Sequence, residues 1–116
     1  MEKFRFEKSR EGDVEKIKLF GYLENSSGAE LKKLFDARLQ DGALKYIIDF
    51  SGIELISSPG VAALLDIGSR IVDDFDGKIS CYGIDSHHLA VLEMSGLFFL
   101  VAQAANEAEA LKQMKE

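Results

Sequence analysis

The sequence has few of the residues that hold small proteins together covalently, and no long apolar run. Its single cysteine, Cys81, cannot form an internal disulfide and lies in the apolar run 79–84, so we expect a buried thiol and a reducing, cytoplasmic environment. No apolar run approaches the ~20 residues of a membrane span, and no signal-peptide segment follows the charged start. With one proline and no repeat, we expect a single domain over residues 1–116 without membrane insertion.

An excess of basic residues is also missing. The chain has 14 Lys and Arg against 20 Asp and Glu, for a net charge of −6, and the acidic residues are dispersed. Nucleic acids and anionic membranes both favour a basic surface, so neither is an expected partner. What the chain does have is 116 residues with 47% apolar content, which is enough to bury a core without a metal or a disulfide.

Hydrophobic patterning predicts five strands. Residues 4–8 and 14–22 alternate apolar and polar side chains, and the turn residues 10–13 between them predict a hairpin. Residues 46–50 form a nearly continuous apolar run, which is typical of a strand covered on both faces. Two further strands are predicted at 78–83 and 97–101, with Phe98, Phe99 and Leu100 in the core. The alternative is that an exposed part of this cluster joins a dimer or partner surface.

Four segments have the 3.6-residue spacing of helices. The first has Ser26 or Ser27 as its expected cap and carries Leu31, Leu34, Phe35 and Leu39. The second begins near Ser58 and is expected to end at Gly77, and its inner stripe is Val61, Leu64, Leu65, Gly68, Ile71, Val72 and Phe75. The third runs from Ser86 to Gly96, and the fourth is capped by Asn106 with Ala108 and Leu111 inward. The order ββαβαβαβα predicts an α/β domain, a short mixed sheet with four helices packed on it.

The second predicted helix opens with Ser58-Pro59-Gly60, which is typical of a helix N-terminus. Proline is favoured at the first helical position, so Ser58 is the expected N-cap. A helix start has unpaired N–H groups and about half a positive charge. A phosphoryl group on Ser58, which carries about −1.5 to −2 charge, would be tolerated there and would change only the surface that a partner meets. From this pattern alone, a purely capping role for Ser58 stays open.

Three segments at matching separations resemble the anti-sigma factor antagonists of the STAS-domain family. The family's second helix opens with an aspartate, a phosphorylatable serine, a second small hydroxyl residue and a glycine. The residues at these positions are Ser57, Ser58, Pro59 and Gly60. Residues 21–24 resemble the turn before the family's first helix, with Glu24 at its aspartate, and residues 92–98 resemble the end of its third helix. Order and spacing agree from about residue 3 to residue 115.

The resemblance implies a regulatory binding protein and not an enzyme. In the family, the unphosphorylated domain binds an anti-sigma factor that is also a serine kinase, which frees a sigma factor for transcription. Phosphorylation by that kinase blocks the complex, and a PP2C-type phosphatase restores it. Carried over to this chain, the resemblance makes Ser58 the phosphate acceptor. It implies no cofactor or metal, and it is compatible with a homodimer. The expected partner surface consists of Glu24, Asn25, Ser57, Ser58 and Gly60.

Two positions depart from the family pattern, because Ser57 replaces the aspartate and Pro59 replaces the second hydroxyl residue. The missing carboxylate removes a polar contact to a kinase, and the proline stiffens the entry to the helix. These departures leave three alternatives open: a divergent kinase partner, phosphorylation at Ser57, or a scaffold subunit of a sensory or transporter assembly that is never phosphorylated. A domain that binds a nucleotide or another small ligand is a further alternative.

The remaining polar clusters are expected to be structural. His87 and His88 are adjacent, so on a helix their side chains point about 100° apart and cannot chelate one metal. Asp73, Asp74 and Asp76 near the end of the second helix are expected to form a solvated face. The sequence contains no glycine-rich phosphate loop. The spacing of Cys81 and the two histidines also does not indicate a catalytic Cys/His pair.

Overall fold

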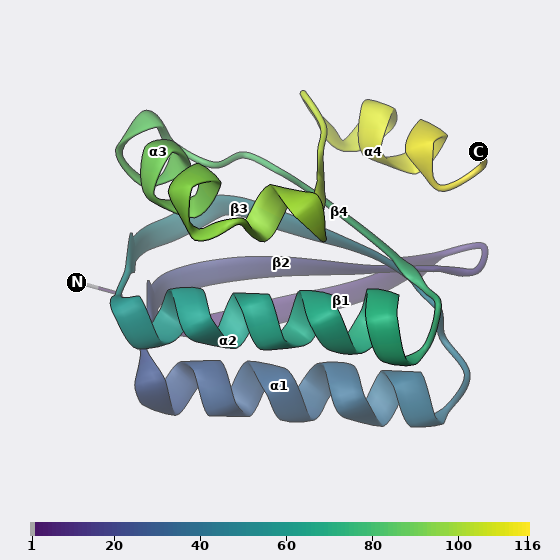
Figure 1. Ribbon diagram of the computed structural model, residues 1–116, viewed down its shortest axis with the longest axis horizontal. Coiled ribbons are helices and arrows are strands. Elements are labelled where there is room, and N and C mark those ends of the chain that lie inside the picture. Colours follow the sequence, from purple (N-terminus) through teal and green to yellow (C-terminus); the bar gives the residue numbers. More distant parts are fainter. Residues whose placement is uncertain (1) are drawn as a thin grey trace.

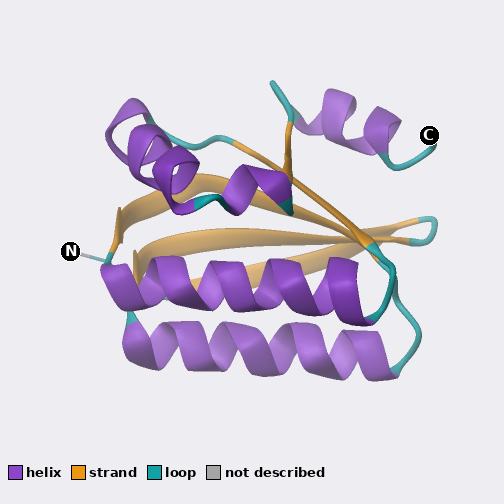
Figure 2. Ribbon diagram, in the orientation of Figure 1, coloured by secondary structure: helices purple, strands orange, loops and turns teal. Residues whose placement is uncertain are grey.

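The computed structural model describes residues 2–116 and contains a five-stranded sheet with helices packed on it (Figure 1). The strands are β1 (Arg5–Glu11), β2 (Val14–Leu23), β3 (Lys45–Ile56), β4 (Lys78–Tyr82) and β5 (Ala102–Gln103). The helices are α1 (Asn25–Gln40), α2 (Ser58–Ser69), α3 (Ser86–Ser95) and α4 (Glu107–Gln113) (Figure 2). A π-helical turn, η1 (Arg70–Asp74), extends α2, and a 3-10 turn, η2 (Leu97–Phe99), follows α3. The predicted order of strands and helices is confirmed.

The sheet is mixed, and its strands lie in sequence order from β1 to β5. β1 pairs with β2 in the predicted antiparallel hairpin, whose turn places Gly12 in the left-handed region at φ 60°. The pairs β2–β3, β3–β4 and β4–β5 are parallel. Parallel neighbours need a crossover between them, and α1, α2 and the α3–η2 segment supply it. The carboxyl ends of β2 and β3 consequently lie beside each other, each followed by the start of a helix.

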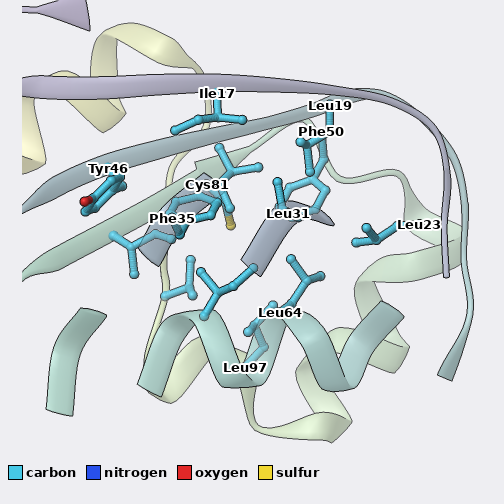
Figure 3. Close-up of a cluster of buried hydrophobic side chains, with 14 of the residues drawn as sticks. Ile17, Leu19, Leu23, Leu31, Phe35, Tyr46, Phe50, Leu64, Cys81 and Leu97 are labelled. Atoms are coloured by element: carbon cyan, nitrogen blue, oxygen red, sulfur yellow. The ribbon is translucent and has the colours of Figure 1, made fainter. Parts of the chain in front are cut away.

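The main core fills the space between the sheet and the helices α1, α2 and α3. Figure 3 shows Ile17, Leu19, Tyr46, Phe50 and Cys81 from the strands facing Leu31, Phe35 and Leu64 from the helices. The opposite face of β3 is covered by α4, where Ile47 packs with Val14, Ala110 and Met114. The prediction of a strand buried on both faces is therefore confirmed for residues 46–50. Cys81 is buried as predicted, and burial raises the pKa of its thiol to about 12.

Two strands continue further than their patterns predicted. β2, which was predicted over residues 14–22, pairs as far as Leu23, and Gly21 within it adopts φ 87° at a register irregularity. The strand predicted at residues 46–50 is also longer than expected, because β3 runs on to Ile56. Within this extension Gly52 has to lack a side chain, since a Cβ atom there would meet the ring of Phe20 and the backbone carbonyl of Leu19.

The predicted strand at 97–101 is wrong. Gly96 adopts φ 87°, which turns the chain at the end of α3, and Leu97–Phe99 form η2 instead. The core prediction fails for Phe99, whose side chain is 93% exposed, whereas the neighbouring Leu97 is buried. Phe98 and Leu100 are partly buried against the main core. The strand that follows, β5, has two residues and pairs with β4.

The ends of two helices also differ from the predictions. Gly77 does not cap α2, because the left-handed residue is Asp76 at φ 58° and Gly77 instead donates its N–H to the Ile71 carbonyl at 2.7 Å. Ala108 of α4 is exposed, contrary to the prediction, whereas Leu111 is partly buried against the cluster of Ala110 and Met114 as predicted. No helix within residues 2–116 is both long and apolar enough to cross a membrane.

Candidate functional site: the paired starts of two helices

The helix α2 begins one residue earlier than the sequence predicted. Its N-cap is Ser57, with extended backbone angles, and the Ser57 Oγ accepts a hydrogen bond from the Gly60 N–H at 3.2 Å. Ser57 also donates its own N–H to the Leu23 carbonyl at 2.9 Å, which holds it at the end of the strand pairing. The prediction of Ser58 as the N-cap is therefore wrong. Ser58 is the first helical residue and Pro59 the second, where a missing N–H group still breaks no helical hydrogen bond.

Ser58 and Pro59 are exposed at the tip of α2, whereas Gly60 is buried. A Cβ atom at Gly60 would collide with the Leu23 carbonyl oxygen, so the glycine lets the first turn of α2 approach the end of β2. Because Ser57 provides the capping oxygen, the exposed Ser58 is not needed for capping. The two adjacent serines thus have different roles: one is part-buried and hydrogen-bonded, the other is presented to solvent.

The helix α1 begins with a reversed capping box. The Glu24 carboxylate accepts hydrogen bonds from the N–H groups of Ser26 and Ser27, each at 3.0 Å, and the Ser27 Oγ accepts one from the Glu24 N–H at 2.8 Å. The predicted caps Ser26 and Ser27 are therefore wrong, and Glu24 is the N-cap. The hydrogen bonds from Ser26 and Ser27 lower the pKa of Glu24, so its carboxylate is ionised at neutral pH.

The two helix starts lie together at one end of the molecule. α1 and α2 run side by side with their first residues at the same end (Figure 1), and Gly28 of α1 lets Ala63 of α2 approach closely. The fold thus brings Glu24 and Asn25 next to Ser57 and Ser58 through the Ser57–Leu23 hydrogen bond. Two helix N-termini give this end a positive potential, which the Glu24 carboxylate partly offsets. An added anion would meet a favourable dipole and an unfavourable carboxylate.

A buried histidine supports this end of the sheet, and sequence reasoning missed it. His88 is 5% exposed, and its Nε2 accepts a hydrogen bond from the N–H of Ile56, the residue before Ser57, at 3.2 Å. Its Nδ1 lies 2.8 Å from Asp85 Oδ1, and the same Asp85 oxygen caps α3 by accepting from the His88 N–H at 2.9 Å. The sequence does contain a signal for this burial, because His88 and the inward Leu92 are four residues apart and so share one face of α3. Asp85, a typical N-cap residue, precedes them. His87 is exposed.

The structure contains other polar features away from these helix starts. A groove of about 420 Å³ between α1 and α2 is crossed by the ion pairs Lys32–Asp66 at 3.3 Å and Arg70–Asp36 at 2.9 Å, so Lys32 and Arg70 already have acidic partners. Asp74 is exposed and pairs with Arg70. Within residues 2–116 no cluster of three or more His, Cys, Asp or Glu side chains could hold a metal ion.

Comparison with known proteins gives a clear structural likeness but no close sequence relative. No family model matches the sequence, and no curated protein matches it. Among solved structures, TM1081 of Thermotoga maritima, described as a candidate anti-sigma factor antagonist, is 21% identical with a TM-score of 0.86, covering 96% of this chain and 95% of that one. An anti-sigma factor antagonist from Mycobacterium paratuberculosis is 14% identical with a TM-score of 0.85, covering 98% and 96%.

The phosphorylated form of SpoIIAA, a Bacillus cell fate determinant, is 22% identical with a TM-score of 0.71, covering 96% of this chain and 98% of that one. The unphosphorylated form of SpoIIAA, described as an anti-sigma factor antagonist, matches with a TM-score of 0.72. A transporter also contains a similar region: the chain matches 18% of the murine Solute Carrier 26 family member A9 anion transporter at 15% identity, with a TM-score of 0.74 over 92% of this chain. The protein has the STAS fold of the anti-sigma factor antagonists, as the sequence predicted.

Proposed function

We propose that this chain is an anti-sigma factor antagonist and that phosphorylation of Ser58 switches its binding. Unphosphorylated, it would bind an anti-sigma factor with serine kinase activity in the cytoplasm and so promote transcription by the released sigma factor. A PP2C-type phosphatase would reverse the modification. The role is that of a binding protein and not of an enzyme. The observation that supports this most strongly is the exposed Ser58 hydroxyl at the tip of α2, freed from capping by Ser57.

The geometry favours Ser58 over Ser57 as the acceptor. The Ser57 Oγ accepts the capping hydrogen bond from Gly60, and modifying this oxygen would disturb the bond, which is worth about 1 kcal/mol in typical helices. Ser58 has an exposed side chain, and adding a phosphoryl group to it breaks no capping interaction. The positive end of α2 would stabilise the added charge by ~0.3–1 kcal/mol. Phosphorylation at Ser58 would therefore leave the fold intact.

The same phosphate would weaken partner binding. The proposed contact surface contains Glu24, Asn25 and the first turn of α2, and Glu24 already places an ionised carboxylate there. A phosphoryl group would bring about two further negative charges into the contact, where a partner surface suited to the unmodified hydroxyl offers them no pairing. Uncompensated desolvation of the phosphate, and its stronger repulsion by Glu24 once the partner excludes water from the contact, would then reduce the affinity.

Measuring affinity for the cognate anti-sigma factor kinase would test the proposal. We expect Ser58→Ala to bind like the wild type but to resist phosphorylation, and Ser58→Asp to bind at least about tenfold more weakly, since 1.4 kcal/mol of lost binding is a factor of ten. Ser57→Ala serves as the matched control and should still be phosphorylated at Ser58, as mass spectrometry of the tryptic peptide would show. Equal affinities of wild type and Ser58→Asp would contradict the proposal.

A second candidate function is a scaffold subunit that is never phosphorylated. The departures at Ser57 and Pro59 favour it, and the likeness to a region of an anion transporter supports it. Mass spectrometry of the tryptic peptide, from protein purified from its native cells, distinguishes the scaffold from the phosphorylated switch. Unmodified Ser58 under all growth conditions would favour the scaffold.

A further inference from the structure

The outer face of α3 is apolar although it faces solvent. His87, Ala90, Val91 and Met94 follow one another at the spacing i, i+3, i+4, i+7, and all four are exposed. Met94 is 88% exposed and Val91 54%. None of the four carries a permanent charge, whereas the opposite side of the same helix buries His88 and Leu92 in the core. A helix that is apolar on both sides is normally covered on both sides.

The apolar surface continues beyond the end of α3. Phe99 of η2 is 93% exposed, and its Cδ2 lies 3.7 Å from where a Cβ atom at Gly96 would be, so its ring stands beside the turn that ends the helix. The exposed sides of α1 and α2 are different, because ion pairs such as Lys32–Asp66 and Arg70–Asp36 cross between them. We name the surface formed by His87, Ala90, Val91, Met94 and Phe99 the α3 stripe. Contiguous exposed apolar surface of this kind marks interaction sites.

The charges around the α3 stripe indicate what it can bind. Between Lys78 and Lys112 the sequence contains no lysine or arginine, and its charged residues are all acidic: Asp85, Glu93, Glu107 and Glu109. Glu93 lies on α3 beside the stripe, and Asp85 is the exposed N-cap at the start of the helix. A second copy of the chain would bring the same acidic side chains against them, and each copy carries a net charge of −6. An anionic membrane would be repelled in the same way.

We propose that the α3 stripe is a docking site for a basic amphipathic helix of a partner protein. The partner helix would lay apolar side chains at i, i+3, i+4 and i+7 along the stripe, with Met94 and Phe99 as the apolar anchors. Lysine or arginine on its flanks would pair with Asp85 and Glu93. Stable complexes bury about 800 Å² per partner, so the stripe would form the apolar centre of a larger contact. This site uses residues of α3 and η2 and not Ser58, and its test does not depend on the proposed switch.

A pair of synthetic helical peptides tests the proposal on the full chain. Each has about 18 residues, five helical turns, with leucine at the stripe spacing; one has lysine on the flanks and the other glutamate. We expect the lysine peptide to bind at least about tenfold more tightly by isothermal titration calorimetry. Met94→Ser and Phe99→Ser should each weaken binding of the lysine peptide several-fold. Leu44→Ser, at an exposed apolar residue outside the stripe (42% exposed), is the matched control and should bind unchanged.

The outcomes separate the possible occupants. Circular dichroism should show all three variants folded, since the substituted side chains are exposed. Equal binding of both peptides, or equal binding by Met94→Ser and Leu44→Ser, would overturn the proposal. So would a wild-type dimer in sedimentation equilibrium that Phe99→Ser dissociates, because the stripe would then be covered by a second copy.

Discussion

The hydrogen bond between His88 and the Ile56 backbone offers a sharp test of how the start of α2 is held. His88→Leu places an apolar side chain of similar size at the same buried position but removes the acceptor at Nε2. The buried N–H of Ile56 is then left unpaired. An unpaired buried donor costs about 1–3 kcal/mol, so we expect the free energy of unfolding to fall by about 2 kcal/mol. For a chain of 116 residues this corresponds to a melting temperature about 8 °C lower.

Two control variants make the result specific. His88→Gln places an amide oxygen near the position of Nε2 and should lose less than about 1 kcal/mol, because the Ile56 donor keeps a partner. His87→Leu changes the exposed neighbour and should stay within about 0.5 kcal/mol of the wild type. The assay is urea unfolding followed by circular dichroism, together with hydrogen exchange at the Ile56 amide. If His88→Leu and His87→Leu had the same stability, the inferred role of this hydrogen bond would be refuted.

Three further predictions concern other parts of the molecule. Ser57→Ala should lower the free energy of unfolding by about 1 kcal/mol in urea, because α2 loses its capping oxygen; no loss would show that Ser57 does not cap in solution. Burial tends to raise the pKa of Glu15, but hydrogen bonds from Arg10 and Arg38 lower it overall. The contribution of the Glu15 carboxylate to stability is therefore complete above about pH 4.5 and is lost as the pH falls through the lower pKa of the folded protein. Glu15→Gln should therefore unfold more easily at pH 7 and have a stability that changes less between about pH 5 and pH 3, and an unchanged urea midpoint at pH 7 would count against the pairing. Cys81, with its buried thiol and raised pKa, should fail to react with Ellman's reagent at pH 8 until guanidinium unfolds the protein, and rapid native labelling would contradict its burial.

The sequence predicted the order of elements because each long element has a clear period. The stripe of Leu31, Phe35 and Leu39 and the continuous run at 46–50 are local signals, and each faces the core as expected. The segment at 97–101 was misread because an apolar run of that length fits a strand as well as a 3-10 turn. The deciding feature is the left-handed turn at Gly96, which leaves Phe99 in solvent.

The two helix starts that form the candidate site follow from the predicted order of elements, but their details depend on contacts between distant residues. Ser57 caps α2 because the Leu23 carbonyl, from another strand, holds its N–H. Glu24 caps α1 although glutamate is not among the residues preferred at that position. The bond from Ile56 to His88 joins residues 32 positions apart, and no local pattern encodes it. The extension of β3 through Gly52 likewise depends on the close approach of Phe20.

A switch at Ser58 requires that this residue can carry a phosphate without disturbing the fold. The most direct measurement is the free energy of unfolding, in urea at pH 7.5, of protein with phosphoserine incorporated at position 58. It should equal or exceed that of the unmodified protein, by up to about 1 kcal/mol. Phosphoserine at Ser69, at the opposite end of α2 and hydrogen-bonded to Asp73 at 3.0 Å, should be destabilising in the same assay. A loss of stability at position 58 as large as that at position 69 would contradict the claim.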